Sequence, residues 1–237
     1  MHGTLARMST AEGARARART EVTAAIKDEA RRQLAAEGAA KLSLRAVARE
    51  LGMVSSALYR YFPSRDDLLT ALIIDAYDSL GEAAERAHQD VPEADFTRRW
   101  TAVCEAVRVW ALAHPHEYAL IYGSPVPGYA APATTIPSAA RVALLLIGVV
   151  RDVHEGPGLT GLSLSAELRP EAERMAADLA PGLPPEAAPA MVAAWAELFG
   201  LVGFEVFGQF TRVVEDRERF FRHAAVRLGE SVGLPAA

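Results

Sequence analysis

Apolar residues recur every three or four positions along most of this 237-residue chain, the spacing that places them on one face of an α-helix. Alternation of apolar and polar residues, which marks a half-buried β-strand, does not extend over any useful length. Since 51% of the residues are hydrophobic and 23% are charged, the chain can bury a real core. The sequence therefore predicts an all-α fold, and it shows no internal repeat.

The periodic segments are separated by glycine and proline, which end helices or cannot continue them. A loop rich in both residues, 123–137, is unusually long for a compact domain, and a second loop is expected over 155–165. The expected helices cover approximately residues 22–37, 43–51, 55–62, 64–89, 96–114, 116–122, 138–154, 170–179, 186–210 and 215–228.

Charge is distributed unevenly along the chain. Residues 1–65 carry a formal charge of +6, whereas the remaining residues carry −11. This contrast indicates an anion-binding module joined to a part that avoids polyanions. The alternative is a biased surface, because nearly all the basic residues are arginine and arginine abundance can reflect nucleotide composition.

Several features favour a cytoplasmic protein without a membrane partner. The single cysteine, Cys104, excludes an internal disulfide and a cysteine-based zinc site. The first twenty residues contain arginines but no apolar run, so no secretory signal is expected. The most apolar run, 142–150, is less than half of the roughly 20 residues needed to span a bilayer.

The segment 42–69, LSLRAVARELGMVSSALYRYFPSRDDLL, has the pattern of a helix-turn-helix. Ser43 can cap the first helix, and Gly52 can adopt the positive φ that a sharp turn needs. Apolar Val47 and Leu58 would fix the second helix against the first. Once fixed, the second helix can enter the major groove of DNA while the first crosses the backbone.

The outer face of the second helix is polar. It presents Ser55, Ser56, Tyr59 and Arg60, which can bond to base edges or phosphates. The alternative interpretation of this segment is a plain helical hairpin in a bundle core, but the exposed polar face and the local positive charge favour DNA binding.

This segment resembles the DNA-binding domain of the TetR family of repressors. The resemblance covers residues 20 to about 80 and is carried by Leu51, Gly52, Leu58, Tyr59 and Phe62, followed by Arg65 and the Leu68-Leu69 pair. Arg60 is the best candidate for a guanine contact, although a phosphate contact is equally compatible. By position, the resemblance implies DNA contacts at Ser43, Arg45, Ser55, Ser56, Ala57, Tyr59, Arg60, Tyr61 and Arg65.

The resemblance also implies how the chain is divided. We expect an N-terminal three-helix helix-turn-helix domain and a C-terminal helical domain that binds a ligand and makes a dimer. The expected parts are a flexible basic arm over residues 1–19, the DNA-binding domain over 20–65, a linker helix over 66–90 and the C-terminal domain over 91–231. The arm, which ends with Arg19, can add minor-groove or phosphate contacts.

The C-terminal part resembles the WHG-type subgroup of the family, through Trp110, the His114-Pro115 pair and a late aromatic helix. For each aromatic residue, lining a ligand cavity and packing in the core are equally compatible with the pattern. The effector-binding candidates are Trp100, Trp110, His114, Tyr118, Tyr122, Trp195 and Phe199. The dimer-interface candidates are Phe204, Phe207, Phe210 and Phe221.

No catalytic constellation is recognisable. The segment Gly161 to Ser165 ends in serine where a nucleophile elbow needs glycine, and no strand precedes it. We expect no enzyme activity, no cofactor and no metal site. The predicted function is a dimeric, DNA-binding transcriptional repressor that a small apolar or aromatic effector releases from a near-palindromic operator. The alternative is an α-helical ligand- or lipid-binding protein, or an enzyme, without a DNA role.

Overall fold

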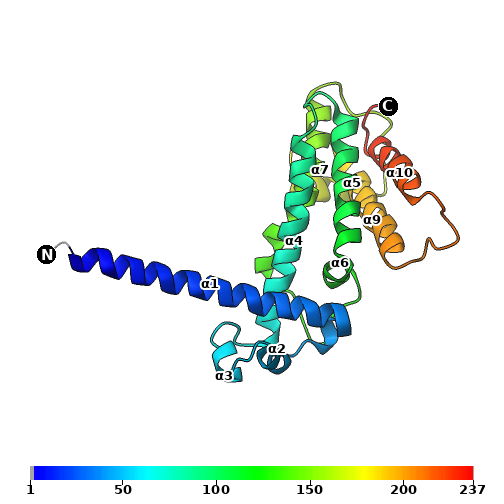
Figure 1. Ribbon diagram of the computed structural model, residues 1–237. Helices are drawn as coiled ribbons and strands as arrows, with labels where there is room; N and C mark the ends of the chain where they lie inside the picture. The colour runs from blue at the N-terminus through cyan, green and yellow to red at the C-terminus, as the bar shows by residue number, and fades with distance from the viewer. Residues whose placement is uncertain (1–2, 237) are drawn as a thin grey trace. The chain divides into compact units, whose positions relative to one another are not determined.

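The computed structural model describes the backbone of residues 3–236 and the side chains of residues 13–236. No strand occurs in residues 3–236, which confirms the all-α prediction (Figure 1). The helices and 3-10 turns are α1 (Gly3–Glu37), η1 (Ala39–Lys41), α2 (Leu44–Glu50), α3 (Ser55–Leu58), α4 (Arg65–Gln89), α5 (Phe96–Ala113), α6 (Pro115–Tyr122), η2 (Ala133–Thr135), α7 (Ile136–Glu155), α8 (Arg169–Leu179), α9 (Ala187–Val206) and α10 (Arg217–Ser231).

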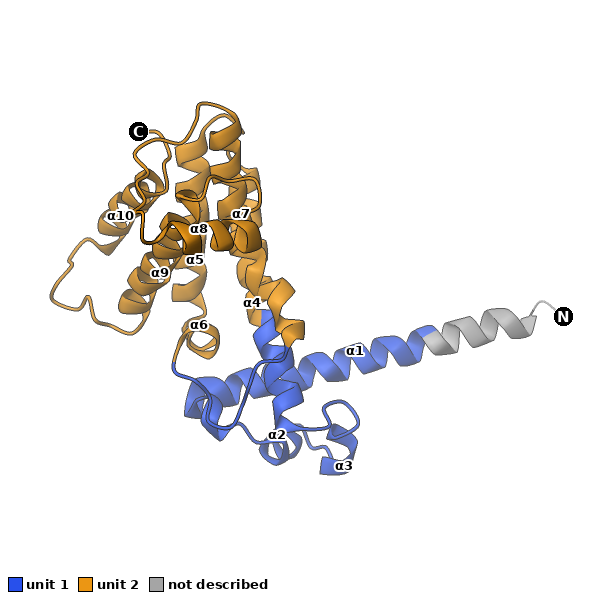
Figure 2. Cartoon of the chain, turned by 180° about the vertical axis from the view of Figure 1, so that it is seen from behind, with its two compact units in different colours: residues 1–75, 124–132 blue, residues 76–123, 133–237 orange. Residues whose placement is uncertain are grey.

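The chain forms two compact units (Figure 2). The first contains residues 1–75 together with a distant segment, 124–132, and the second contains residues 76–123 and 133–237. Helix α4 belongs to both, since its residues up to Asp75 lie in the first unit and those from Ala76 lie in the second. The long glycine- and proline-rich loop, 123–137, is divided between the units as well. Its residues 124–132 belong to the first unit, and the residues on either side belong to the second.

The first unit is organised by the turn between α2 and α3. The Ser43 hydroxyl accepts a hydrogen bond from the Ala46 amide at 3.4 Å and so caps α2. Gly52 has a φ of 64°, in the left-handed region that favours glycine. Ile26, Val47 and Leu58 are completely buried, which holds α2 and α3 against α1.

Helix α1 is longer than the sequence analysis predicts. Residues 13–19 are helical and continuous with the rest of α1, where the prediction was a flexible arm. The segment alternates alanine and arginine, two residues of high helix propensity, so it can extend an existing helix without packing against a core. Its described side chains are almost all exposed.

The second unit has a core built around α5, which packs against α7, α9 and α10. Trp100 of α5 is 1% exposed, and its indole N–H donates to the Ala225 carbonyl of α10 at 3.1 Å. The Arg108 guanidinium of α5 makes a two-bond contact with the Glu205 carboxylate of α9, at 2.6 and 2.7 Å. Apolar packing and paired charges together fix these helices.

Helix α9 ends at Val206, four residues before the predicted end. Gly208 has a φ of 81°, its amide donates to the Glu205 carbonyl, and the Gln209 amide donates to the Phe204 carbonyl. This is the Schellman arrangement that terminates helices. Phe207 and Phe210 consequently lie in the connection to α10 and not on a helix.

Two helices are apolar enough to cross a membrane by length and composition alone: α9 and the segment Ala133–Glu155, which contains α7. The core helix of a soluble protein passes the same test. Val149 and Val153 of α7, and Leu198 and Val202 of α9, are almost completely buried in the core of the second unit. Packing in this core therefore accounts for part of their apolar character.

Candidate DNA interface and ligand cavity

Helix α3 and the turn after it present polar side chains to solvent. Ser55, Ser56 and Arg60 are exposed, and Tyr59 is 41% exposed. The underside of the same segment is apolar, with Leu58 completely buried and Phe62 7% exposed. The segment is therefore anchored on one side and leaves its polar side free to contact a partner.

Two arginines beside this surface are unpaired. Within the part of the chain whose side chains are described, neither Arg45 of α2 nor Arg60 has a hydrogen bond or ion pair. An unpaired guanidinium offers five N–H donors, which match the oxygen atoms of phosphates and guanine. This arrangement suits binding to a polyanion.

Two other predicted contact residues lie at the edges of this surface. Ala57 and Tyr61 are half-buried. The Arg19 guanidinium of α1 lies 5.2 Å from the centre of the Tyr61 ring, which is cation–π distance. This contact connects the basic part of α1 to the segment that follows α3.

Arg65, which was predicted to contact DNA, has partners within the first unit. Its guanidinium donates to three backbone carbonyls, those of Ala39 at 2.8 Å, Ala40 at 3.2 Å and Leu42 at 3.2 Å. These acceptors lie where η1 leads into α2, so Arg65 holds the start of α4 against the approach to α2. The local sequence does not reveal this role, because the acceptors are backbone atoms more than twenty residues away.

Helix α4 is bound tightly within the first unit at Asp75. The carboxylate accepts a hydrogen bond from Lys27 at 2.8 Å and from Arg31 at 2.7 Å, both on α1. Three residues later, Asp78 is bound within the second unit. The two contacts are therefore almost one helical turn apart on the same helix.

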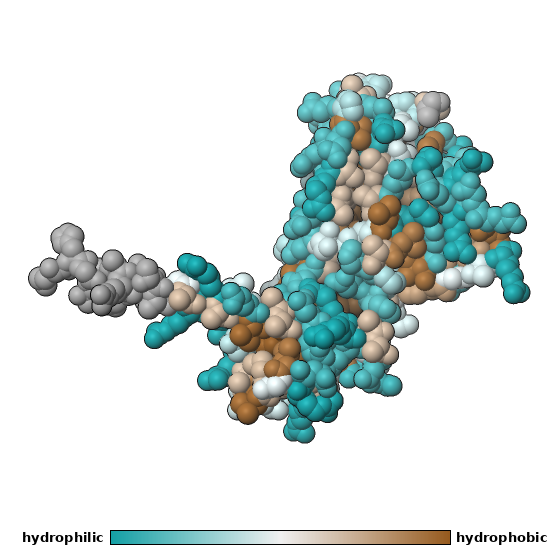
Figure 3. Space-filling model, viewed as in Figure 1, coloured by the Kyte–Doolittle hydropathy of each residue, from teal (hydrophilic) through white to brown (hydrophobic). Residues whose placement is uncertain are grey.

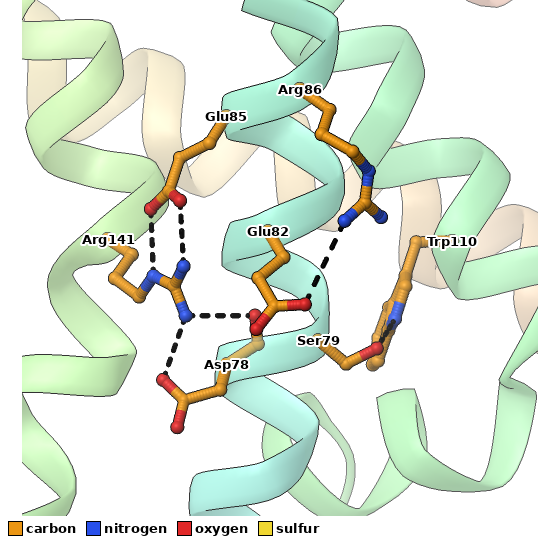
Figure 4. Close-up of polar contacts among 7 residues, drawn as sticks. All are labelled: Asp78, Ser79, Glu82, Glu85, Arg86, Trp110 and Arg141. Atoms are coloured by element: carbon orange, nitrogen blue, oxygen red, sulfur yellow. Dashed lines mark hydrogen bonds and ion pairs between the residues drawn. The ribbon is translucent and has the colours of Figure 1, made fainter.

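Arg141 of α7 makes the contact in the second unit (Figure 4). It donates two hydrogen bonds to the Glu85 carboxylate, at 2.8 and 2.7 Å, and two more to the carboxylate and carbonyl oxygens of Asp78, each at 3.0 Å. The bond from Arg141 holds the pKa of Glu85 below its usual range. A Cβ at Gly81 would lie 2.9 Å from the Arg141 Cβ, so the absence of a side chain there permits this close approach.

The second unit contains an apolar cavity of about 360 Å³ between α5, α7, α8 and α9. The only charged residue of its lining is Asp178. The lining residues are Trp100, Ala140, Ala143, Leu144, Leu146, Ile147, Asp178, Leu179, Ala180, Ala188, Met191, Val192 and Trp195. The volume lies in the range of small-molecule sites, and the composition suits a largely apolar ligand.

Of the predicted effector contacts, Trp100 and Trp195 line this cavity. Phe199 and Tyr122 lie beyond its wall, in a row of rings that runs from the cavity to α4. Ring centres are 4.5 Å apart for Trp195 and Phe199, 4.1 Å for Phe199 and Tyr122, and 5.9 Å for Tyr122 and Tyr77 of α4. The row connects the cavity wall to α4 through direct ring contacts.

The other predicted effector residues have partners within the core. The Tyr118 hydroxyl donates to the Phe199 carbonyl at 2.8 Å, and burial raises the pKa of this phenol above its usual range. The Trp110 indole donates to the Ser79 hydroxyl at 2.9 Å, and its ring stacks on His114. None of Trp110, His114 and Tyr118 lines the cavity.

Apolar side chains also reach the surface of the second unit, as the brown areas of Figure 3 show. Phe204 is 54% exposed and Phe207 is 48% exposed. Phe221, predicted as a dimer contact, is 3% exposed and packs under Arg108, so it belongs to the core of the second unit. Phe220 is 39% exposed, because adjacent residues on a helix point about 100° apart.

Both parts of the chain match known protein families. Residues 26–72 match the family described as bacterial regulatory proteins, tetR family, and residues 100–228 match the family described as tetracyclin repressor-like, C-terminal domain. The HTH-type transcriptional regulator Rv1816 of Mycobacterium tuberculosis is 41% identical over 206 residues, which cover 84% of this chain and 86% of the relative. The regulator Mb1846 of Mycobacterium bovis matches equally well.

Solved structures agree with these matches. The crystal structure of the regulatory protein SCO4313 is 34% identical, with a TM-score of 0.74, and the match covers 89% of this chain and 96% of that one. The TetR family transcriptional regulator PfmR from Thermus thermophilus shares the fold at 18% identity, with a TM-score of 0.59 and coverage of 86% and 96%.

Proposed function

The chain belongs to the TetR family of DNA-binding transcriptional regulators, and from this premise we propose that it is a homodimeric repressor released from its operator by a small ligand. The observation that carries the proposal is the solvent-exposed polar surface of α3 with the unpaired cations beside it. The site of action is the cytoplasm, where the DNA partner is found.

The operator contact is made by α3 in the major groove. Arg60 and Tyr59 reach the DNA from the segment after α3, and Arg45 binds a phosphate from α2. Arg65 contributes indirectly, because its three carbonyl contacts hold the entry to α2 in place. The basic residues of α1 through Arg19 add phosphate contacts from a helix.

The dimer forms through α9, α10 and the connection between them. Phe204, Phe207 and Phe220 expose apolar rings there, and Phe204 and Phe220 each contact Phe210 in edge-to-face geometry. A two-fold axis would bring the same rings of both subunits together. Two α3 helices about 34–36 Å apart would then read the half-sites of a near-palindromic operator.

Release begins in the cavity of the second unit and proceeds through α4. Helix α7 provides five cavity-lining residues and also Arg141, which holds Asp78 and Glu85 of α4. The aromatic row from Trp195 to Tyr77 provides a second connection. A ligand that binds one arrangement of α7 more tightly shifts α4 and changes the spacing of the two α3 helices.

Footprinting on the DNA upstream of the protein's own gene tests the DNA contact. Arg60→Ala is expected to abolish protection, whereas the matched control Arg174→Ala, which removes an exposed cation on α8 that pairs with Glu171, should leave it unchanged. Unchanged protection by Arg60→Ala would contradict this docking. Circular dichroism of both variants checks that the fold is retained.

The coupling needs a separate test. Arg141→Met removes the contacts to Asp78 and Glu85 while keeping an unbranched side chain in place. The variant is expected to bind DNA but to lose most of its response to a ligand that releases the parent protein. A full response would show that Arg141 does not carry the signal.

A further inference from the structure

We propose that the cavity of the second unit takes a lipophilic cation, a molecule with an apolar body and an ammonium group at one end. The inference rests on the proposed function only in taking this cavity as the ligand site. The side chain that selects the charge of the ligand is Asp178.

The cavity offers an incoming ligand apolar surface almost everywhere. The one polar atom of the buried Trp100 side chain is already bound to the Ala225 carbonyl, so this residue contributes ring carbons. Two tryptophans and Met191 line the wall, and indole faces and thioethers attract cations and polarisable groups. Such a lining accepts the apolar body of a ligand.

Asp178 is the exception in this lining, and it has no counter-ion. Among the residues whose side chains are described, no hydrogen bond or ion pair reaches its carboxylate. The basic residue one turn earlier, Arg174, is paired with Glu171. Arg151 donates to the Pro181 carbonyl and does not line the cavity. The exposed carboxylate is therefore free to pair with an external cation.

The position of Asp178 reinforces this selection. It lies in the last turn of α8, where the helix dipole places partial negative charge. The charge of the carboxylate and the dipole act in the same direction.

The test uses three probes with one decyl chain and different head groups: decyltrimethylammonium, 1-decanol and decyl sulfate, all below their micellar concentrations. Binding to the full-length protein is measured by calorimetry and by tryptophan fluorescence. The cation is expected to bind about fivefold more tightly than the alcohol, with the sulfate weakest. Because the carboxylate is exposed, this preference should shrink as salt rises.

Two variants of one residue make the assignment specific. Asp178→Asn should remove the preference for the cation without affecting decanol, and Asp178→Lys should make decyl sulfate the preferred probe. A lysine is compatible with the last turn of a helix, so the fold should be retained, which circular dichroism verifies. The control Glu173→Gln removes an exposed carboxylate of the same helix that does not line the cavity, and it should change nothing.

A third variant locates the binding. Ala143→Phe fills the cavity and should weaken all three probes together. The proposal is overturned if no probe binds, if the sulfate or alcohol equals the cation, or if Asp178→Asn keeps the preference. Footprinting without any probe reports the DNA contact independently, so failure of this inference remains distinguishable from failure of the proposed function.

Discussion

The core of the second unit and the helix-turn-helix of the first unit use arginine in opposite ways. In the second unit, Arg99, Arg108 and Arg141 each bind carboxylates of other helices or loops and are largely removed from solvent. At the helix-turn-helix of the first unit, Arg45 and Arg60 are exposed and have no partner in the described part of the chain. A cation that is paired inside the protein stabilises the fold, whereas one left unpaired is available to an external anion.

The largest expected effect comes from replacing a paired arginine, and it is a loss of stability. Arg108→Met leaves the Glu205 carboxylate, which is 5% exposed, without its partner. Loss of one member of a buried pair costs about 3–5 kcal/mol of unfolding free energy. Urea denaturation at fixed protein concentration measures the loss, and Arg60→Met should lie within about 0.5 kcal/mol of the parent.

The double variant Arg108→Met with Glu205→Leu separates pairing from packing. Replacing both charges by apolar side chains should restore most of the lost stability. If the double variant is as unstable as Arg108→Met alone, the contact between Arg108 and the Phe221 ring, and not the ion pair, carries the effect.

The next effect in size concerns DNA affinity. Arg60→Ala should weaken operator binding by about 1–3 kcal/mol for each subunit, because a guanidinium contact is lost from each half-site. Electrophoretic mobility shift at several salt concentrations also identifies the type of contact. If the slope of log affinity against log salt concentration becomes shallower, and affinity falls equally for all DNA sequences, Arg60 contacts a phosphate. If affinity falls only for the operator, Arg60 contacts a guanine.

A smaller effect is expected from the basic end of α1. Arg15→Ala combined with Arg17→Ala removes two exposed cations. Non-specific DNA affinity should fall by less than in Arg60→Ala, and the salt slope should fall by about one for each lost phosphate contact. The melting temperature should be unchanged. If the variant binds DNA as tightly as the parent protein at every salt concentration, this segment has no role in DNA binding.

The smallest expected effect is a dependence of stability on pH that comes from His88 of the second unit. The pKa of His88 is lowered by burial and, secondarily, by the adjacent Arg99 charge, and Asp152 opposes the shift. A histidine with a lowered folded pKa contributes stability that is present above its unfolded pKa of about 6.5 and is lost as pH falls through the folded pKa. Melting temperature should therefore decline below about pH 6.5, and His88→Gln should flatten that decline.

Much of the first unit can be predicted from sequence because its signals are local. Ser43 caps the helix three residues before the amide it binds, and Gly52 adopts the positive φ that the turn requires. The side chains expected to face outward, Ser55, Tyr59 and Arg60, are exposed. The role of Arg65 was missed because its acceptors are backbone atoms distant in sequence, and these carry no residue-type signal.

The second unit was less predictable for a physical reason. A cavity is formed where side-chain volume is missing, and alanines such as Ala140, Ala143 and Ala188 look like ordinary helix formers in a sequence. The aromatic residues were recognisable, but whether each faces a cavity or a neighbouring ring depends on helix rotation. Phe220 and Phe221 illustrate this, since one position along the helix separates an exposed ring from a buried one.

Helix α4, which contributes residues to both units, restricts where the chain can gain or lose residues. Asp75 and Asp78 are bound within different units, and the continuous helix between them fixes their angular offset around its axis. Inserting or deleting one residue between them would rotate one set of contacts by about 100° relative to the other. We therefore expect an insertion or deletion at this position to disturb contacts of α4, and an exchange of ligand domains between relatives should retain the register of this helix.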